Sequence, residues 1–194
     1  MSDETTAGGD LGTTFLASVR RETAMYRRLA ERALAQVDEA QFFAAEGGET
    51  NSLAVVAKHL GGNLRSRWRD FLTTDGEKPD RDRDSEFVIA AGTRREEVMA
   101  LWEEGWGHLE ATLAALAPED LARQVTIRGE PHGVVDAIHR QLAHTAYHVG
   151  QIVMLARHHA GEAWQTLSVP RGGSVEFNRK MAEKYGRAAD SAPG

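Results

Sequence analysis

The longest uninterrupted hydrophobic pattern in the chain runs from Gly133 to His159. Apolar residues recur in this segment at steps of three and four, which indicates an amphipathic helix of about seven turns. It contains no proline and one interior glycine, Gly150. The apolar stripe consists of Val134, Ile138, Leu142, Val149, Ile152, Val153 and Leu155. We expect the other elements of the fold to pack around this helix.

Three further segments show the same helical period. They run from Leu11 to about Val37, from Leu53 to about Phe71, and from a capping box at Thr93–Glu96 to Pro118. Asn51 and Ser52 are good N-caps for the second of these helices. Residues 73–87 form a long, highly charged connection. Four long amphipathic helices without a convincing sheet predict an all-α fold, a four-helix bundle.

Two shorter segments flank the Gly133–His159 helix. Gln124–Arg128 favours an extended conformation and is followed by Gly129, so we expect a short extended stretch or small hairpin before the helix. Ser174 can cap a short C-terminal helix that ends near Tyr185. The domain prediction is a disordered leader at 1–10, one helical domain at 11–186 and a tail at 187–194.

Composition narrows the functional classes. The chain has 194 residues, 41% hydrophobic and 27% charged, as is typical of a soluble globular domain. The net charge of −6 and the lack of a basic run argue against nucleic acid as a partner. No segment is apolar enough for a signal sequence or a membrane span, so we expect a cytoplasmic location. The chain has no cysteine, which excludes disulfides, thiolate metal sites and a cysteine nucleophile.

The candidate chemistry lies on the Gly133–His159 helix. His144 and His148 are four positions apart, so both imidazoles project from one face. Their stripe also carries Ala137, Gln141 and Gln151, which is the spacing of a buried seam. Two neutral imidazoles that face inward can bind a transition metal. The alternative is that they are ordinary surface or core histidines.

A third histidine, His59, lies on or beside the apolar face of the Leu53–Phe71 helix. Three imidazoles would leave a coordination position for water or substrate, as in catalytic sites. Five other histidines lack a comparable partner or setting: His108, His132, His139, His158 and His159. The Glu-x-x-His motif of di-iron bundles is absent, and so is the His-Glu-x-x-His motif of metalloproteases.

Several neighbours could assist such a site. Arg65 and Arg67 follow His59 by one to two turns and could bind a substrate carboxylate, or simply be solvated. Asn63, Gln141 and Gln151 could hydrogen-bond the histidines from outside the ligand set.

The loop from Leu167 to Ser174 holds Arg171 between Pro170 and two glycines. The rigid proline and the flexible glycines would set Arg171 at a defined position. It could clamp an anionic substrate or a carboxylate across a dimer interface, or pair with an acidic residue of the bundle.

Three segments together resemble the DinB/YfiT-like superfamily, and more narrowly a bacterial branch of it without an assigned function. They are Lys58–Asp84, His139–His158 and Leu167–Asn178. The resemblance implies a four-helix bundle with a crossing connection, a divalent metal on His59, His144 and His148, and frequently a homodimer. Some members of the superfamily are metal-dependent thiol S-transferases or isomerases that use low-molecular-weight thiols.

The functional hypothesis is therefore a divalent-metal-dependent enzyme that acts on a small molecule as a thiol S-transferase, isomerase or hydrolase. Zn, Ni, Co and Fe(II) all suit three imidazoles, and any thiol would come from a cosubstrate. The alternative is a non-catalytic, metal-binding dimeric bundle with a stress-associated or structural role. The chain has more large aromatic residues than a bundle of this length must bury internally, which predicts a homodimer interface that includes some of Trp68, Trp102, Trp106 and Trp164.

Overall fold

The computed structural model of the chain describes residues 10–186. The expected leader, apart from Asp10, and the expected tail lie outside the described residues. The helices are α1 (Leu11–Leu34), α2 (Glu39–Phe43), α3 (Leu53–Trp68), α4 (Arg95–Ala115), α5 (Val134–Ala160) and α6 (Ser174–Tyr185). Short 3-10 turns are η1 (Asp84–Phe87), η2 (Pro118–Ala122) and η3 (Gly161–Ala163), and the strands are β1 (Gln124–Ile127) and β2 (Glu130–Gly133).

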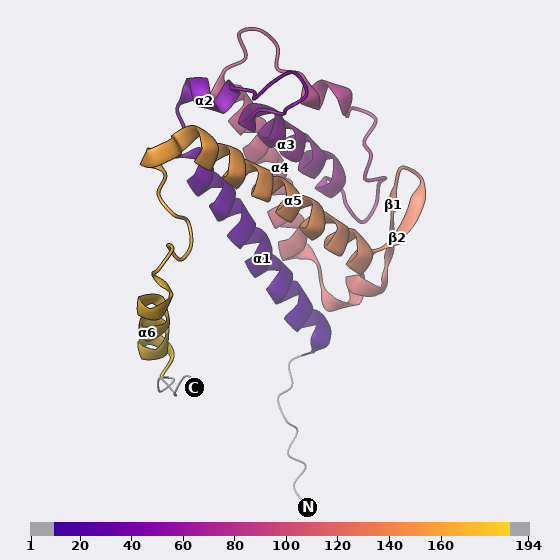
Figure 1. The fold of residues 1–194 in the computed structure, drawn as a ribbon. Helices are drawn as coiled ribbons and strands as arrows, with labels where there is room; N and C mark the ends of the chain where they lie inside the picture. Colours follow the sequence, from indigo (N-terminus) through magenta and orange to yellow (C-terminus); the bar gives the residue numbers. More distant parts are fainter. Residues whose placement is uncertain (1–9, 187–194) are drawn as a thin grey trace, which may run out of the picture.

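The four long helices α1, α3, α4 and α5 lie side by side (Figure 1). Each packs on two of the others, because α3 contacts α4 and α5 while α1 contacts α5 and α4. Their apolar faces meet in one core whose largest fully buried members are Trp68, Trp102, Trp106, Phe42, Leu60, Ile138 and Ile152. The predicted all-α class is confirmed, with a two-stranded sheet as its single addition in the described part of the chain.

The expectation that the four tryptophans exceed what the core can bury was wrong, while the homodimer itself stays a prediction. Trp68, Trp102 and Trp106 are all buried within the core, and Trp164 packs partly against it. A helical domain of this size does accommodate these side chains internally. Within residues 10–186, no helix has both the length and the apolar character that crossing a bilayer requires.

Helix boundaries follow local capping chemistry. Ser52 caps α3 as expected, since its hydroxyl accepts a hydrogen bond from the Val55 amide. Helix α3 ends at Trp68, before the expected Phe71, and Asp70 then takes a left-handed conformation with φ of 50°.

Two other predicted caps were wrong. Helix α4 starts after Arg94 and not at Thr93, because the Glu97 side chain accepts the Arg94 amide. Ser174 is the first residue of α6, and its hydroxyl makes no cap.

The extended segment before α5 is a hairpin. Strands β1 and β2 are antiparallel, with Ile127 paired to Glu130. The two-residue turn between them is Arg128–Gly129, and both residues have positive φ, 58° and 76°. Such a turn matches the twist of the strands and is usually made of asparagine and glycine. The hairpin sits beside the N-terminal end of α5 (Figure 1).

Glycines let α3 and α4 approach very closely. A Cβ atom at Gly105 of α4 would overlap the carbonyl oxygen of Gly61 in α3. A Cβ at Gly61 would stand only 2.8 Å from the carbonyl oxygen of Leu101. Backbone therefore packs against backbone at this crossing, and a side chain at either position would separate the helices.

Gly105→Ala should lower the free energy of unfolding by about 1–3 kcal/mol, because the new methyl group meets rigid backbone. The matched control is Gly107→Ala on the same helix, where a Cβ meets nothing within 4 Å. That control should be neutral or stabilising by up to about 1 kcal/mol, since alanine favours helix more than glycine does. Urea unfolding of both variants measures the difference, and equal effects would contradict the close helix contact.

Candidate metal centre

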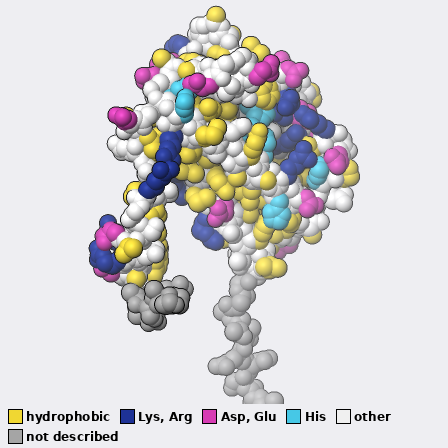
Figure 2. Space-filling model, viewed as in Figure 1, with side chains coloured by type: hydrophobic (Ala, Val, Ile, Leu, Met, Phe, Trp, Pro, Cys, Tyr) yellow, Lys and Arg dark blue, Asp and Glu magenta, His cyan; other side chains and the backbone are white. Residues whose placement is uncertain are grey.

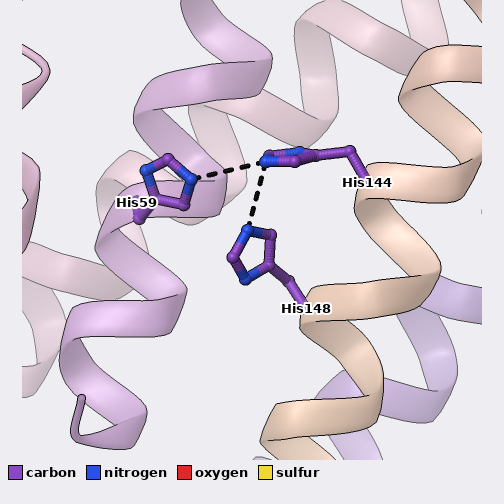
Figure 3. A group of neighbouring side chains, drawn as sticks. All are labelled: His59, His144 and His148. Atoms are coloured by element: carbon purple, nitrogen blue, oxygen red, sulfur yellow. Dashed lines mark hydrogen bonds between the residues drawn. The ribbon is translucent and has the colours of Figure 1, made fainter. Parts of the chain in front are cut away.

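Three imidazoles converge between α3 and α5. The Nε2 atom of His144 lies 3.4 Å from Nε2 of His59 and 3.1 Å from Nε2 of His148. His59 comes from α3 and the other two from successive turns of α5 (Figure 3). The three residues offer ligand atoms within 4.8 Å of one another. His59 and His148 are buried and His144 is half-buried.

The outer nitrogen of His59 is held by a carboxylate. His59 Nδ1 lies 2.8 Å from Oε2 of Glu86 in η1, and both side chains are buried. A carboxylate only accepts, so the ring carries its proton on Nδ1 and donates it to Glu86. Nε2 of His59 then presents a lone pair toward the other two histidines. Phe87 packs against the same ring at a tilt of 32°, with 4.6 Å between centroids.

The outer nitrogen of His148 is held in the same way by an amide. Its Nδ1 lies 2.8 Å from Oε1 of Gln151, whose own NH₂ group donates to the hydroxyl of Tyr147. Nδ1 of His148 is therefore the donor, and its Nε2 also presents a lone pair. Nδ1 of His144 is buried and has no hydrogen-bond partner within residues 10–186.

This arrangement fits a divalent cation. With all three rings neutral, at most one N–H, that of His144, lies among the three converging nitrogens, so at least one close pair faces lone pair to lone pair. A cation between them would replace that repulsion with three bonds. Tetrahedral ligands at Zn–N distances of 2.0–2.1 Å stand about 3.3 Å apart. The two separations from His144 Nε2, 3.4 and 3.1 Å, are close to this value. Three imidazoles also leave a position open for a substrate atom.

Burial keeps His144 and His148 neutral. It lowers the pKa of His144 to about 3, and electrostatic interactions with His148, His59, Arg81 and Arg67 lower it further. Burial also lowers the pKa of His148, against a partial compensation from its hydrogen bond to Gln151. A neutral imidazole is the form that binds a metal, so no proton must leave these two rings near neutral pH.

Glu86 was missed by the sequence analysis, which treated its segment only as a charged connection. Its carboxylate also accepts two hydrogen bonds from Arg81, at 2.8 and 3.0 Å. Burial alone would raise the pKa of Glu86, but the hydrogen bonds from His59 and Arg81 outweigh it and hold that pKa below its usual range. Gly62 provides the space, because a Cβ there would stand 2.5 Å from Oε1 of Glu86.

A cavity of about 250 Å³ opens beside the histidines. His59 and His144 contribute to its wall, so a ligand in the cavity could reach the centre. The other lining residues include four apolar ones, Trp68, Phe71, Ile127 and Ala137, and five arginines, Arg67, Arg81, Arg83, Arg128 and Arg140. No carboxylate of the described chain lines it.

Of the predicted neighbours, Asn63, Arg67 and Gln141 line the cavity. Gln141 is occupied by packing contacts, since it accepts from Trp68 Nε1 and donates to Thr145. Gln151 holds His148, as described above.

Arg65 and Arg171 lie elsewhere. Arg65 pairs with Glu104 at 3.1 Å and lines a separate cavity behind Glu86. Arg171 is exposed and is not among the residues that line the cavity beside the histidines. The structure therefore brings together only part of the predicted set.

The other five histidines have partners of their own. His139 packs edge-on against Phe15, while four lie near a carboxylate: His108 at Glu104, His132 at Glu130, and His158 and His159 at Glu46.

Residues 10–173 match the family described as "Protein of unknown function (DUF1572)". The chain belongs to this family. No curated protein and no solved structure matches the chain. The DUF1572 match spans both α3 and α5, so all three histidines lie inside the shared region.

His144→Ala and His148→Ala should each abolish retention of one divalent ion, because two imidazoles rarely hold such an ion against water. His158→Ala should not, since that side chain is exposed and pairs with Glu46. Metal content of protein purified without a polyhistidine tag measures the effect. Full metal content in either α5 variant would contradict the assignment of His144 and His148 as metal ligands.

Glu86→Gln should weaken metal affinity about 10- to 100-fold without removing a ligand, as is typical when the partner of a ligating histidine is changed. The neutral amide can still accept from His59 but no longer raises the basicity of the ring. The control is Glu104→Gln, an exposed carboxylate on α4. Competition with a chelator gives both affinities, and equal values would show that Glu86 acts only in packing.

Proposed function

We propose that the chain is a divalent-metal-dependent enzyme acting on a small molecule, with His59, His144 and His148 as the metal ligands. The observation that carries the proposal is the pair of outer contacts, His59 Nδ1 to Glu86 and His148 Nδ1 to Gln151, each 2.8 Å long. Both outer nitrogens donate outward, so both Nε2 lone pairs turn inward beside a cavity. Zn, Ni, Co or Fe(II) would each suit three imidazoles.

His59, His144 and His148 would hold a divalent ion, which would supply Lewis-acid chemistry by lowering the pKa of a bound water or thiol toward neutral pH. The protein's own residues do the rest. Glu86 and Gln151 hold the ligand rings in place, and the apolar wall of Trp68, Phe71 and Ile127 excludes water from one side of the cavity. Asn63 offers a buried amide oxygen, Oδ1, that has no partner within the described chain.

A bound metal would activate either kind of nucleophile. It would lower the pKa of a water ligand to about 7. It would also lower the pKa of a thiol ligand, which is about 8.5 when free. The reaction proposed here is thiol S-transfer or isomerisation with a low-molecular-weight thiol cosubstrate, as the sequence resemblance implies, with hydrolysis as the second possibility. The thiol must come from outside, because the chain has no cysteine.

The arrangement of the helices and of the three histidines supports the proposal that this fold is a four-helix bundle of the DinB/YfiT type. Four long helices with mutual packing, a long connection between α3 and α4, and a three-histidine set on α3 and α5 are the features that the sequence resemblance implies. The family match itself identifies only a group without an assigned function.

The alternative function is a non-catalytic, metal-binding dimer. One observation favours self-association: large apolar side chains are exposed on α5 and α6, among them Met154 at 66% and Val175 at 84%. Helix α6 has no buried residue and stands apart from the long helices, and hydrophobic side chains also gather on the face shown in Figure 2. Burying such surfaces in a second copy would be favourable. Light scattering at micromolar concentration should then give about twice 21.3 kDa.

The deciding experiment is turnover by metal-loaded protein. Chain loaded separately with Zn, Ni, Co or Fe(II) should transfer glutathione or cysteine to an electrophilic acceptor, and His148→Ala should lose at least about 10²-fold in rate. Esters serve as the comparison substrates for hydrolysis. Stoichiometric metal with no turnover on either substrate class, together with a dimeric mass, would favour the non-catalytic alternative.

A further inference from the structure

The cavity wall concentrates positive charge. Five arginines line it, whereas the whole chain carries a net charge of −6. Ion pairs within 4 Å connect four of these arginines to just three carboxylates, Glu77, Glu86 and Asp84. Arg140 makes no ion pair within residues 10–186. The arginines therefore outnumber the carboxylates that neutralise them.

Glu77 makes most of these ion pairs. Its Oε2 atom lies 3.2 Å from Arg67, 3.0 Å from Arg81 and 3.3 Å from Arg128. One carboxylate cannot neutralise three guanidinium groups. A further carboxylate, Asp75, lies close enough to interact with Arg67, and backbone amides hold its oxygens. With Asp75 included, five arginines still face four carboxylates, so an excess of positive charge remains.

Arg67 is the buried member of this group. Its side chain is 10% exposed, and Nη1, although 3.2 Å from Glu77, is not aligned to donate to it. That buried atom has no hydrogen-bond partner in the part of the chain that the structure describes. Burial lowers the pKa of Arg67 to about 10, with a partial compensation from Glu77 and further lowering by Arg81, Arg128 and Arg140. A buried donor without an acceptor is costly, and an anion in the cavity would satisfy it.

Arg128 occupies the cavity wall in a strained conformation. It is the first residue of the hairpin turn, with φ of 58°, a region that side chains other than glycine and asparagine rarely adopt. Asp75 holds the turn by accepting the Arg128 amide at 2.8 Å and the Gly129 amide at 2.7 Å. Strain of this kind tends to persist where a side chain is needed at that point.

The rest of the wall is apolar or neutral. Trp68, Phe71, Ile127 and Ala137 can contact a carbon skeleton, and Asn63 offers its unpartnered Oδ1 one turn from His59. A ligand with a carboxylate or phosphate at one end and an apolar body would match both parts of the cavity.

We propose that Arg67, Arg128 and Arg140 form an anion subsite, so that the substrate is a small organic molecule carrying a carboxylate or a phosphate. The proposal rests on the proposed function only in assigning this ligand the role of substrate. The anion would accept hydrogen bonds from Arg67 and Arg128 while its apolar body extends along Trp68 toward His59 and His144. Neither Arg128 nor Arg140 was singled out in the sequence.

Calorimetric titration with benzoate, phenyl phosphate and neutral benzamide tests the subsite. The full-length His148→Ala chain is used beside the wild type, because His148 does not line the cavity and its loss separates anion binding from metal binding. Both anions should bind both proteins at least about tenfold more tightly than benzamide, as expected for charged hydrogen bonds. Their relative affinities distinguish a carboxylate from a phosphate substrate.

Arg67→Met should weaken anion binding at least about tenfold. The matched control is Arg65→Met, which removes the same charge two residues away on α3 but from a side chain outside the cavity. Arg128→Gly should weaken anion binding but leave the melting temperature unchanged or raise it, because glycine adopts the positive φ without strain.

The subsite is overturned if benzamide binds as tightly as the anions, or if Arg65→Met and Arg67→Met weaken binding equally. It is also overturned if Arg128→Gly lowers the melting temperature and leaves anion affinity unchanged. Anion binding by the His148→Ala chain without turnover by the metal-loaded wild type would retain the subsite and remove the proposed enzyme. Turnover of neutral substrates but not of anionic ones would support the proposed enzyme and overturn the anion subsite.

Discussion

The buried carboxylate of Glu86 is the group on which the site depends. It joins α3 to the long connection that follows, because it accepts from His59 on one side and from Arg81 on the other. An isolated charge in this position would be very unfavourable, and the two partners are what keep it ionised. The orientation of the first histidine is thereby linked to the path of residues 69–94. The space for this link exists because residue 62 has no side chain.

Much of the fold could be predicted because burial leaves a periodic signature. The apolar stripes identified all four long helices, and helix geometry placed His144 and His148 on one face. The same geometry could have separated Arg65 from Arg67. With about 100° of rotation per residue, Asn63 and Arg67 fall near the face of His59, whereas Arg65 points to the other side.

Glu86 could not be found in this way. It lies in a connection with several other acidic residues and no period, so nothing local distinguishes the one carboxylate that turns inward. The partner that selects it, His59, is 27 positions away, and the path between them is decided by tertiary contacts. The predicted N-caps Thr93 and Ser174 were wrong for a related reason. Several residues near each end could cap, and small differences in packing select among them.

The charge distribution illustrates the limit of a whole-chain average. An acidic net charge describes the field at a distance, where salt screens individual groups within about 10 Å. Inside a partly closed cavity the nearest side chains determine the potential, and here they are arginines. A protein with a negative net charge can therefore still attract an anion at a particular point.

The ligands of the centre are far apart in the chain, and this has a consequence for how the protein is made. His59 and His144 are separated by 85 positions, and α4 and the hairpin lie between them. During synthesis from the N-terminus, α3 leaves the ribosome long before α5 exists. His59 is therefore present before His144 and His148 have been made. A helix α5 on its own offers only two of the three imidazoles. In the proposed metal centre an ion would be captured fully only when α5 has docked, which would make metal uptake one of the last events in folding.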